Sequence, residues 1–335
     1  MGVKHLLKRG ALLAAANWPT IVIQFVAETT FQVLMAVPII GAAILVAVLL
    51  GADLADLLQG SLREIFTTIA STLLSEPIAL VAFIAAFAVV LFGGSVFMFL
   101  VKGGTVDVLI AANEAVGPIE LEPITLEALR AASRFTLQRF TEGCARLFRP
   151  YLALGLVLMV VYAISVGSYV AAILYGYRIA TDKFLIVGWT FVAAVAAALL
   201  MLWFTLANLL YLLVQIAIAV EGVGLVDAAR AVARFIRAEF RELAAVFLVV
   251  LALVVGATFA SALAWSGVGL IAFVPLVGLA VFPLQVAALL LRGFVYEYLG
   301  LTALGAYLTL YTGYAARRAE AVGPSPITSP VHHPV

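Results

Sequence analysis

The chain has 335 residues, of which 65% are hydrophobic and only 11% are charged, and its mean hydropathy is +1.20. Soluble domains are about 45–50% apolar and about 25% charged, so a water-soluble fold could not bury this much apolar surface. Several apolar runs exceed the roughly 18 residues that a membrane span requires. The composition therefore excludes an ordinary soluble protein and predicts an integral membrane protein.

The charged, cysteine and histidine residues exclude further classes. The formal net charge of +1 gives no indication of a nucleic-acid partner. The single cysteine, Cys144, excludes an intrachain disulfide bond. The three histidines, His5, His332 and His333, all lie near the chain ends. Because histidine is the usual protein ligand of haem and zinc, we expect no such cofactor inside the membrane.

The segment 1–19 precedes the first long apolar run. It carries three cations, Lys4, Lys8 and Arg9, beside a short apolar stretch. A cleaved signal peptide is one interpretation, but its apolar core would be short, and a long apolar segment follows after only a few residues. We therefore expect an amphipathic helix in the membrane interface, with Trp18 at the headgroup level, where tryptophan is enriched.

Six apolar segments of span length follow, so the predicted fold is all-α with six transmembrane helices. They are expected at about 20–50, 77–101, 151–176, 184–220 and 243–264, with the sixth within about 270–300 and ending before Arg292. The fourth is long enough to tilt or to extend beyond the bilayer. In the sixth, Pro275 and Pro283 predict kinks or boundaries, because proline cannot donate a helical backbone hydrogen bond.

Lysine and arginine are unevenly distributed among the connections. Sixteen of the nineteen lie in the N-terminal segment, in the 102–149 and 221–242 connections, and after the sixth span. The positive-inside rule places these regions and both termini in the cytoplasm. The mainly acidic connection 51–76 is predicted as an external amphipathic segment. We expect a multi-pass protein of a bacterial cytoplasmic (inner) membrane.

The C-terminal part of the chain leaves two interpretations open. Residues 293–316 could form a seventh span, but this would leave Arg317 and Arg318 outside. We favour a cytoplasmic or interfacial helix, or a continuation of a steeply tilted sixth helix. The segment 317–335 is rich in proline and serine and is predicted to be disordered. The transmembrane domain is accordingly predicted over 20–316.

A charged phrase occurs twice, one hundred residues apart. It reads EALRAASRF at 127–135 and DAARAVARF at 227–235, and each copy lies in a basic connection between two spans. This arrangement predicts a twofold internal repeat of a span, an amphipathic cytoplasmic helix and a span, over about 77–176 and 184–264. The alternative is chance matching between alanine-rich sequences.

Arginines of the repeated phrase form a stripe. In the second copy they recur at helical spacing and cover an arc of only about 60°. An arginine near an anionic membrane surface contributes about 1 kcal/mol of attraction. These side chains are candidates for contact with anionic phospholipids or a protein partner; alternatively, they only enforce topology and anchor the connection. The six residues are Arg130, Arg134, Arg230, Arg234, Arg237 and Arg241.

A family resemblance rests on the same phrase. Acidic and small apolar residues leading into EALRAASRF, between two hydrophobic spans, resemble polytopic bacterial membrane proteins related to the membrane domain of glycerophosphodiester phosphodiesterases. The resemblance covers about 60–250. It implies no catalysis, because the chain has no soluble phosphodiesterase domain and no cluster of Glu, Asp and His that could hold that enzyme's metal.

The first span contains the most unusual polar residues. Gln24, Glu28 and Gln32 are spaced by four residues and lie on one helix face. A charge near mid-bilayer costs about 2.5–3.5 kcal/mol on insertion scales, so this face is a candidate proton, ion or substrate site. The alternative is a hydrogen-bond clamp between the first span and its neighbours. Secondary candidates in other spans are Asn208, Gln215 and Gln285.

No catalytic motif accompanies these residues: the chain has no GxSxG with a partner histidine, no HExxH and no Walker loop. We therefore expect no enzyme, no metal site and no cofactor. The favoured function is a structural or accessory subunit that scaffolds a complex, as a homo-oligomer or with a membrane-protein partner, or organises lipid through its arginines.

The second function class is a transporter or channel component for a lipid or small molecule, with the polar face of the first span as its lining. Sparse intramembrane polar residues and the lack of a clear pair of broken helices favour the scaffold. The position of Glu28 discriminates between the two. A hydrated cavity among several helices would indicate transport, and a dry packed contact would indicate a scaffold.

Overall fold

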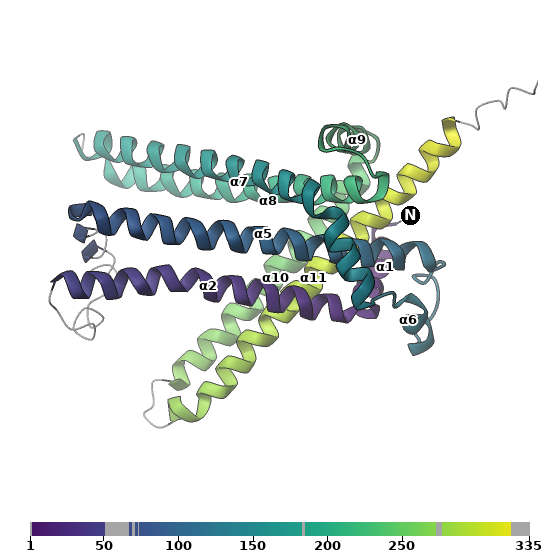
Figure 1. Cartoon of the computed structure of the whole chain (residues 1–335), viewed down its shortest axis with the longest axis horizontal. Coiled ribbons are helices and arrows are strands. Elements are labelled where there is room, and N and C mark those ends of the chain that lie inside the picture. The colour runs from purple at the N-terminus through teal and green to yellow at the C-terminus, as the bar shows by residue number, and fades with distance from the viewer. Residues whose placement is uncertain are drawn as a thin grey trace, which may run out of the picture.

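The computed structural model describes residues 2–50, 67–68, 71–72, 74–182, 185–272 and 277–322. Within these ranges the chain forms helices and no strand, as predicted (Figure 1). The helices are α1 (Val3–Ala16), α2 (Trp18–Leu50), α5 (Pro77–Ala115), α6 (Leu126–Ala132), α7 (Leu137–Asp182), α8 (Ile186–Glu221), α9 (Leu225–Ala238), α10 (Phe240–Ala272) and α11 (Val277–Val322).

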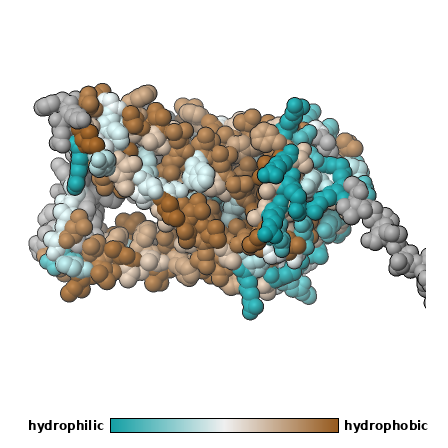
Figure 2. Space-filling view, turned by 90° about the horizontal axis from the view of Figure 1, so that it is seen from above, coloured by the Kyte–Doolittle hydropathy of each residue, from teal (hydrophilic) through white to brown (hydrophobic). Residues whose placement is uncertain are grey.

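Six of the described helices, α2, α5, α7, α8, α10 and α11, are long and apolar enough to cross a membrane. Many of their large apolar side chains are exposed; Ile78 is 87% exposed and Val187 is 81% exposed. Contiguous apolar surface of this extent is covered by lipid in a membrane protein. Figure 2 shows apolar residues over most of the length and polar residues gathered at one end. The prediction of a polytopic, all-α membrane protein is confirmed.

The polar end collects the short helices. Figure 1 shows α6 and α9 at the same end of the helix bundle as α1 and the N-terminus. Local signals define these turns: Thr125 Oγ1 accepts a hydrogen bond from the Ala128 amide at 3.2 Å and caps α6. Gly222, with φ of 65°, ends α8 in the left-handed conformation. Both arginine-bearing connections therefore face one side, and the compartment on that side stays a prediction.

Helix α1 is present where an amphipathic helix was predicted, but its apolar side faces protein rather than lipid. It packs along the C-terminal half of α11, and Leu6 and Leu13 are at most 1% exposed. Two glycines permit this close contact: a Cβ added at Gly305 would lie 2.9 Å from the Gly10 Cα. The N-terminal segment is thus part of the buried core at the polar end.

Arg9 on α1 is buried, although basic residues of this segment were expected at the membrane surface. Its Nε donates to Asn113 Oδ1 at 2.9 Å, and its Nη2 donates to the Asn113 and Val116 carbonyls at 3.0 and 3.1 Å. Its Nη1 donates to the Gly117 carbonyl and to Glu120 Oε2, both at 2.9 Å. The Glu120 side chain is fully buried. The bonds to Asn113 fix α1 to the end of α5, and the ion pair fixes it to the connection that follows α5.

Helix α11 is a single helix of 46 residues, so 293–316 continues the sixth span, which was one of the favoured interpretations. Pro283 lies inside this helix, and Pro275 lies outside the described residues. The boundary at 317 is wrong, because α11 includes Arg317, whose Nη2 pairs with Glu239 Oε1 at 2.5 Å. Most of the segment predicted to be disordered, 317–335, and most of the external segment predicted over 51–76 also fall outside the described residues.

The two copies of the predicted repeat differ in structure. Helix α6 ends at Ala132, so that Arg134 and Phe135 lie beyond it, whereas α9 includes both Arg234 and Phe235. In the first copy the flanking helices α5 and α7 pack along each other. In the second copy α8 packs mainly on α7 and α9, and α10 packs on α11. The internal repeat therefore stays a prediction.

The spans are arranged as two groups. Helices α2, α5, α7 and α8 run together, whereas the paired α10 and α11 diverge from them toward the end opposite α1 (Figure 1). The long helix α11 crosses from this diverging arm into the buried core under α1. Its middle part, around residue 297, therefore lies where the two groups meet.

Candidate functional site

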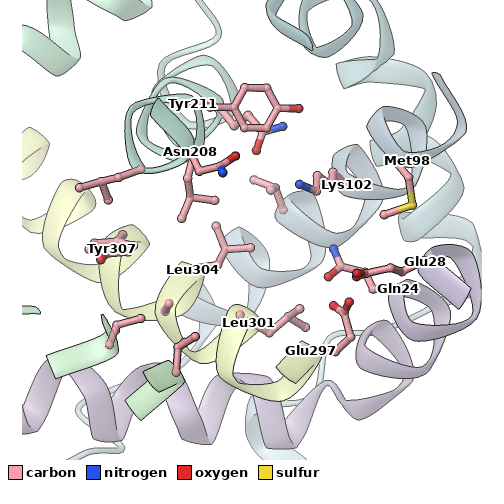
Figure 3. Close-up of a pocket in the computed structure, with 18 of the residues that line it drawn as sticks. Gln24, Glu28, Met98, Lys102, Asn208, Tyr211, Glu297, Leu301, Leu304 and Tyr307 are labelled. Atoms are coloured by element: carbon pink, nitrogen blue, oxygen red, sulfur yellow. The ribbon is translucent and has the colours of Figure 1, made fainter. Parts of the chain in front are cut away.

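A cavity of about 650 Å³ lies where the two groups of spans meet, among α2, α5, α8, α10 and α11 (Figure 3). This volume is within the range of about 300–1,000 Å³ that is typical of ligand sites. Leucine, phenylalanine, methionine and valine side chains form much of the wall. The polar lining consists of Gln24, Glu28, Ser95, Lys102, Thr205, Asn208, Tyr211, Gln215, Glu297 and Tyr307.

The predicted polar face of the first span faces this cavity in part. Gln24 and Glu28 line it, and Gln32 lies further along the helix, where its Nε2 donates to Glu28 Oε1 at 3.3 Å. Among the secondary candidates, Asn208 and Gln215 line the cavity, whereas Gln285 does not. The structure therefore brings most of the predicted intramembrane polar residues together.

Lys102 and Glu297 also line the cavity, and neither was predicted as a site residue. The Lys102 Nζ lies 5.4 Å from the centroid of the Tyr211 ring, a cation–π distance. Glu297, from α11, and Glu28, from α2, both border this cavity. Figure 3 shows the Glu297 carboxyl directed toward Glu28 and Gln24, with the Lys102 amine on the same side of the cavity. Three helices thus contribute one charged side chain each.

Two buried polar groups at the cavity have no partner within the described part of the chain. Gln215 is 1% exposed, and its Nε2 makes no hydrogen bond; the hydroxyl of Tyr211, which is 5% exposed, makes none either. More than about 90% of buried polar groups in proteins are hydrogen-bonded. A water molecule or the polar group of a ligand can satisfy these atoms, because both residues border the open volume.

A second cavity, of about 750 Å³, shares Glu28 and Glu297 with the first. It lies between α2 and the diverging pair α10 and α11, and the basic side chain in its lining is that of Arg292. The Arg292 guanidinium carbon lies 5.7 Å from the Tyr296 ring centroid, and the Tyr296 hydroxyl is 2.9 Å from Thr258 Oγ1. The two carboxyl groups therefore stand between two cavities, each of which contains a cation.

The predicted arginines lie away from both cavities, at the polar end. Arg230, Arg234, Arg237 and Arg241 are all exposed, and Arg230 pairs with Asp227 at 3.0 Å. The opposite side of α9 is buried against protein: its central aromatic residue, Phe235, lies 5.1 and 5.4 Å from the rings of Tyr311 and Tyr314. This packing leaves the arginine side of α9 free for solvent or lipid headgroups.

The arginines of the first connection are also exposed, but they are held differently. Arg130 lies in the last turn of α6, and Arg134 lies in the short connection to α7. Asn17 Oδ1, at the joint of α1 and α2, accepts hydrogen bonds from the amides of Arg134 and Phe135 at 2.8 and 3.1 Å. The backbone of this connection is thus anchored to α1, and the anchoring does not involve the arginine side chains.

Within the described ranges, no group of three or more His, Cys, Asp or Glu residues could hold a metal ion. Comparisons with protein-family models, with curated proteins and with solved structures find no match to this chain. Because a fold class alone does not define a function, the function has to be inferred from the geometry and chemistry of the cavities.

Proposed function

We propose that this protein binds an amphipathic molecule in the cavity among α2, α5, α8, α10 and α11 and carries it within or across the membrane. The observation that supports this most is the convergence of Lys102, Glu28 and Glu297 on one open volume. Charged groups in the membrane are costly and mark substrate or ion pathways. A packing clamp would hold Glu28 in a dry contact, so the cavity favours the transport alternative over the scaffold.

The lining specifies an amphipathic ligand. The charged and amide groups can hold a polar head, whereas side chains such as Phe31, Leu301 and Leu304 offer an apolar surface to a hydrocarbon part. With both signs of charge present, the cavity does not select a simple anion or a simple cation. The polar end, with its excess of lysine and arginine, is on the cytoplasmic side of a bacterial inner membrane in this proposal.

Reconstitution into liposomes tests this function. Phospholipids labelled on an acyl chain are placed in one leaflet, and their movement is followed by fluorescence quenching from outside. Replacing Lys102 with Gln should slow this movement by about tenfold or more, because a charge-assisted hydrogen bond is worth about 1.5–3 kcal/mol and each 1.4 kcal/mol is a factor of ten. Glu28→Gln should act in the same direction.

The matched control is Glu114→Gln, on α5 like Lys102, because Glu114 is exposed and lines neither cavity. This variant should move lipid at the wild-type rate. If the wild-type protein moves no labelled lipid faster than protein-free liposomes do, the transport proposal is rejected.

Three exposed arginines of α9, Arg230, Arg234 and Arg237, and Arg241 in the first turn of α10 support a second role, contact with anionic phospholipids. Replacing Arg230, Arg234, Arg237 and Arg241 together with Gln should abolish the preference of the reconstituted protein for phosphatidylglycerol over phosphatidylcholine, since each arginine contributes about 1 kcal/mol near an anionic surface. Electron spin resonance of spin-labelled lipids measures the preference directly. The fold should be unchanged, because these substitutions leave the buried side of α9 intact. If the lipid preference is unchanged, the arginines only set the membrane topology.

A further inference from the structure

The second cavity combines both signs of charge in the apolar part of the molecule. Arg292 is on one wall, and the Glu28 and Glu297 carboxyls are at the border with the first cavity. Its other walls include Phe25, Val286, Leu289 and Leu290, which are apolar. The cavity lies between α2 and the pair α10 and α11, and Leu290 and Leu291 at this level of α11 are exposed, so the site is next to the apolar surface that lipid covers.

Arg292 has no acidic partner among the described residues. Its side chain is exposed, and its recorded contact is the ring of Tyr296. An arginine within a membrane span is retained at a cost of a few kcal/mol on insertion scales, which indicates a function. Because the planar guanidinium donates two parallel hydrogen bonds to phosphate oxygens, the group that this side chain suits best is a phosphate.

The two carboxyl groups suit a different part of the same headgroup. The Glu297 carboxyl is directed toward Glu28 (Figure 3), and both residues line the second cavity as well as the first. Carboxylate oxygens accept the N–H bonds of a primary ammonium group, which offers three donors. A quaternary ammonium group offers no donor to these oxygens, and a glycerol headgroup brings no charge to them.

We propose that the second cavity is a lateral binding site for a phospholipid whose headgroup carries a phosphate and a primary ammonium group, as phosphatidylethanolamine does. Arg292 holds the phosphate, and the Glu28–Glu297 pair holds the ammonium. This inference rests on the transport function proposed above and names its substrate class. It also assigns the path: the ammonium stays on the shared carboxyl pair while the phosphate passes from Arg292 in the second cavity to Lys102 in the first.

Binding of defined lipids to the delipidated protein in detergent, followed by native mass spectrometry, tests the site separately from transport. The wild-type protein should bind phosphatidylethanolamine about tenfold more tightly than phosphatidylcholine or phosphatidylglycerol with the same acyl chains, which corresponds to one lost charge-assisted contact. Glu297→Gln should reduce the affinity for phosphatidylethanolamine to that for phosphatidylglycerol. Arg292→Gln should weaken the binding of all three lipids.

Arg292→Lys and Arg178→Gln are the matched variants. The first keeps the charge without the planar fork and should retain part of the affinity. The second removes an exposed arginine on α7 that lines neither cavity, and it should bind as the wild type does. Size-exclusion profiles and melting temperatures identify any variant that fails to fold. If Arg292→Gln does, the lipid affinity of Arg292→Lys is compared with that of the wild type instead.

The outcomes separate this proposal from the function on which it rests. Lipid movement in liposomes without headgroup preference, together with unchanged binding in Arg292→Gln, overturns the headgroup site and leaves transport in place. No movement of any lipid rejects transport itself. Soluble phosphoethanolamine in excess should not displace the bound phospholipid; displacement at comparable affinity would assign the site to a water-soluble molecule and overturn the lipid proposal.

Discussion

Replacing Arg9 with Met should lower the free energy of unfolding by about 3–5 kcal/mol, because removal of one member of a buried ion pair leaves the other charge uncompensated. The remaining charge is Glu120, whose side chain is 0% exposed. The same substitution removes the donors of the Asn113, Val116 and Gly117 carbonyls. Reversible unfolding in mixed detergent micelles, followed by intrinsic fluorescence, measures the loss.

Two variants determine whether the buried pair is the cause. Lys4→Met removes an exposed cation from the same helix and should change stability by no more than about 0.5 kcal/mol. The double variant Arg9→Met/Glu120→Met should be more stable than Arg9→Met alone, because the orphaned carboxylate is removed with its partner. If Arg9→Met and Lys4→Met were equally stable, the hydrogen bonds and the ion pair of Arg9 would not be what holds α1 in place.

The apolar part of each of the six spans could be predicted, because a window of 18 or more apolar residues is a local property of the sequence. Their ends could not, because several helices continue past the apolar window. Helix α5 was expected to end near residue 101, where Lys102 interrupts the apolar run, but it continues to Ala115. In the structure its last turns are covered by α7 and α1, and this tertiary packing is not visible in a hydropathy profile.

The cavity could be predicted only in part, for a related reason. Glu28 is conspicuous because it is the single charged residue in the apolar run 20–50. Its helical spacing from Gln24 and Gln32 is also visible in the local sequence. Lys102 and Glu297 stand at the edges of apolar runs, where a charge is ordinarily a connection residue. Their role depends on contacts between α2, α5 and α11, which are far apart in the chain.

The amphipathic connector illustrates the same limit. The arginine stripe of α9 and its apolar opposite side follow from helical periodicity, and the structure shows both. Periodicity does not specify which surface the apolar side contacts. The side chain of Phe235 packs against Tyr311 on the extension of α11, so the apolar side is covered by protein. Lipid contact is therefore expected through the arginines alone.

Replacing Gly10 with Ala should destabilise the protein by at least about 1–3 kcal/mol, the usual cost of overpacking a tight core. The new Cβ would lie 2.7 Å from the Ala306 amide nitrogen and still closer to the Thr302 carbonyl oxygen. Both are backbone atoms of α11, so no side-chain rotation can relieve the contact. Helix α1 must therefore move away from α11, and this movement also strains the hydrogen bonds of Arg9 to the end of α5.

The control is Gly300→Ala, on α11 itself, where an added Cβ would meet no atom within 4 Å. Alanine favours a helix over glycine by up to about 1 kcal/mol, so this variant should be as stable as the wild type or more stable. Hydrogen exchange adds a local measurement: the amides of α1 should lose protection in Gly10→Ala and keep it in Gly300→Ala. If the α1 amides were equally protected from exchange in both variants, the close contact at Gly10 would not be needed to hold α1 on α11. The hydrogen bonds of Arg9 would then hold α1 without that contact.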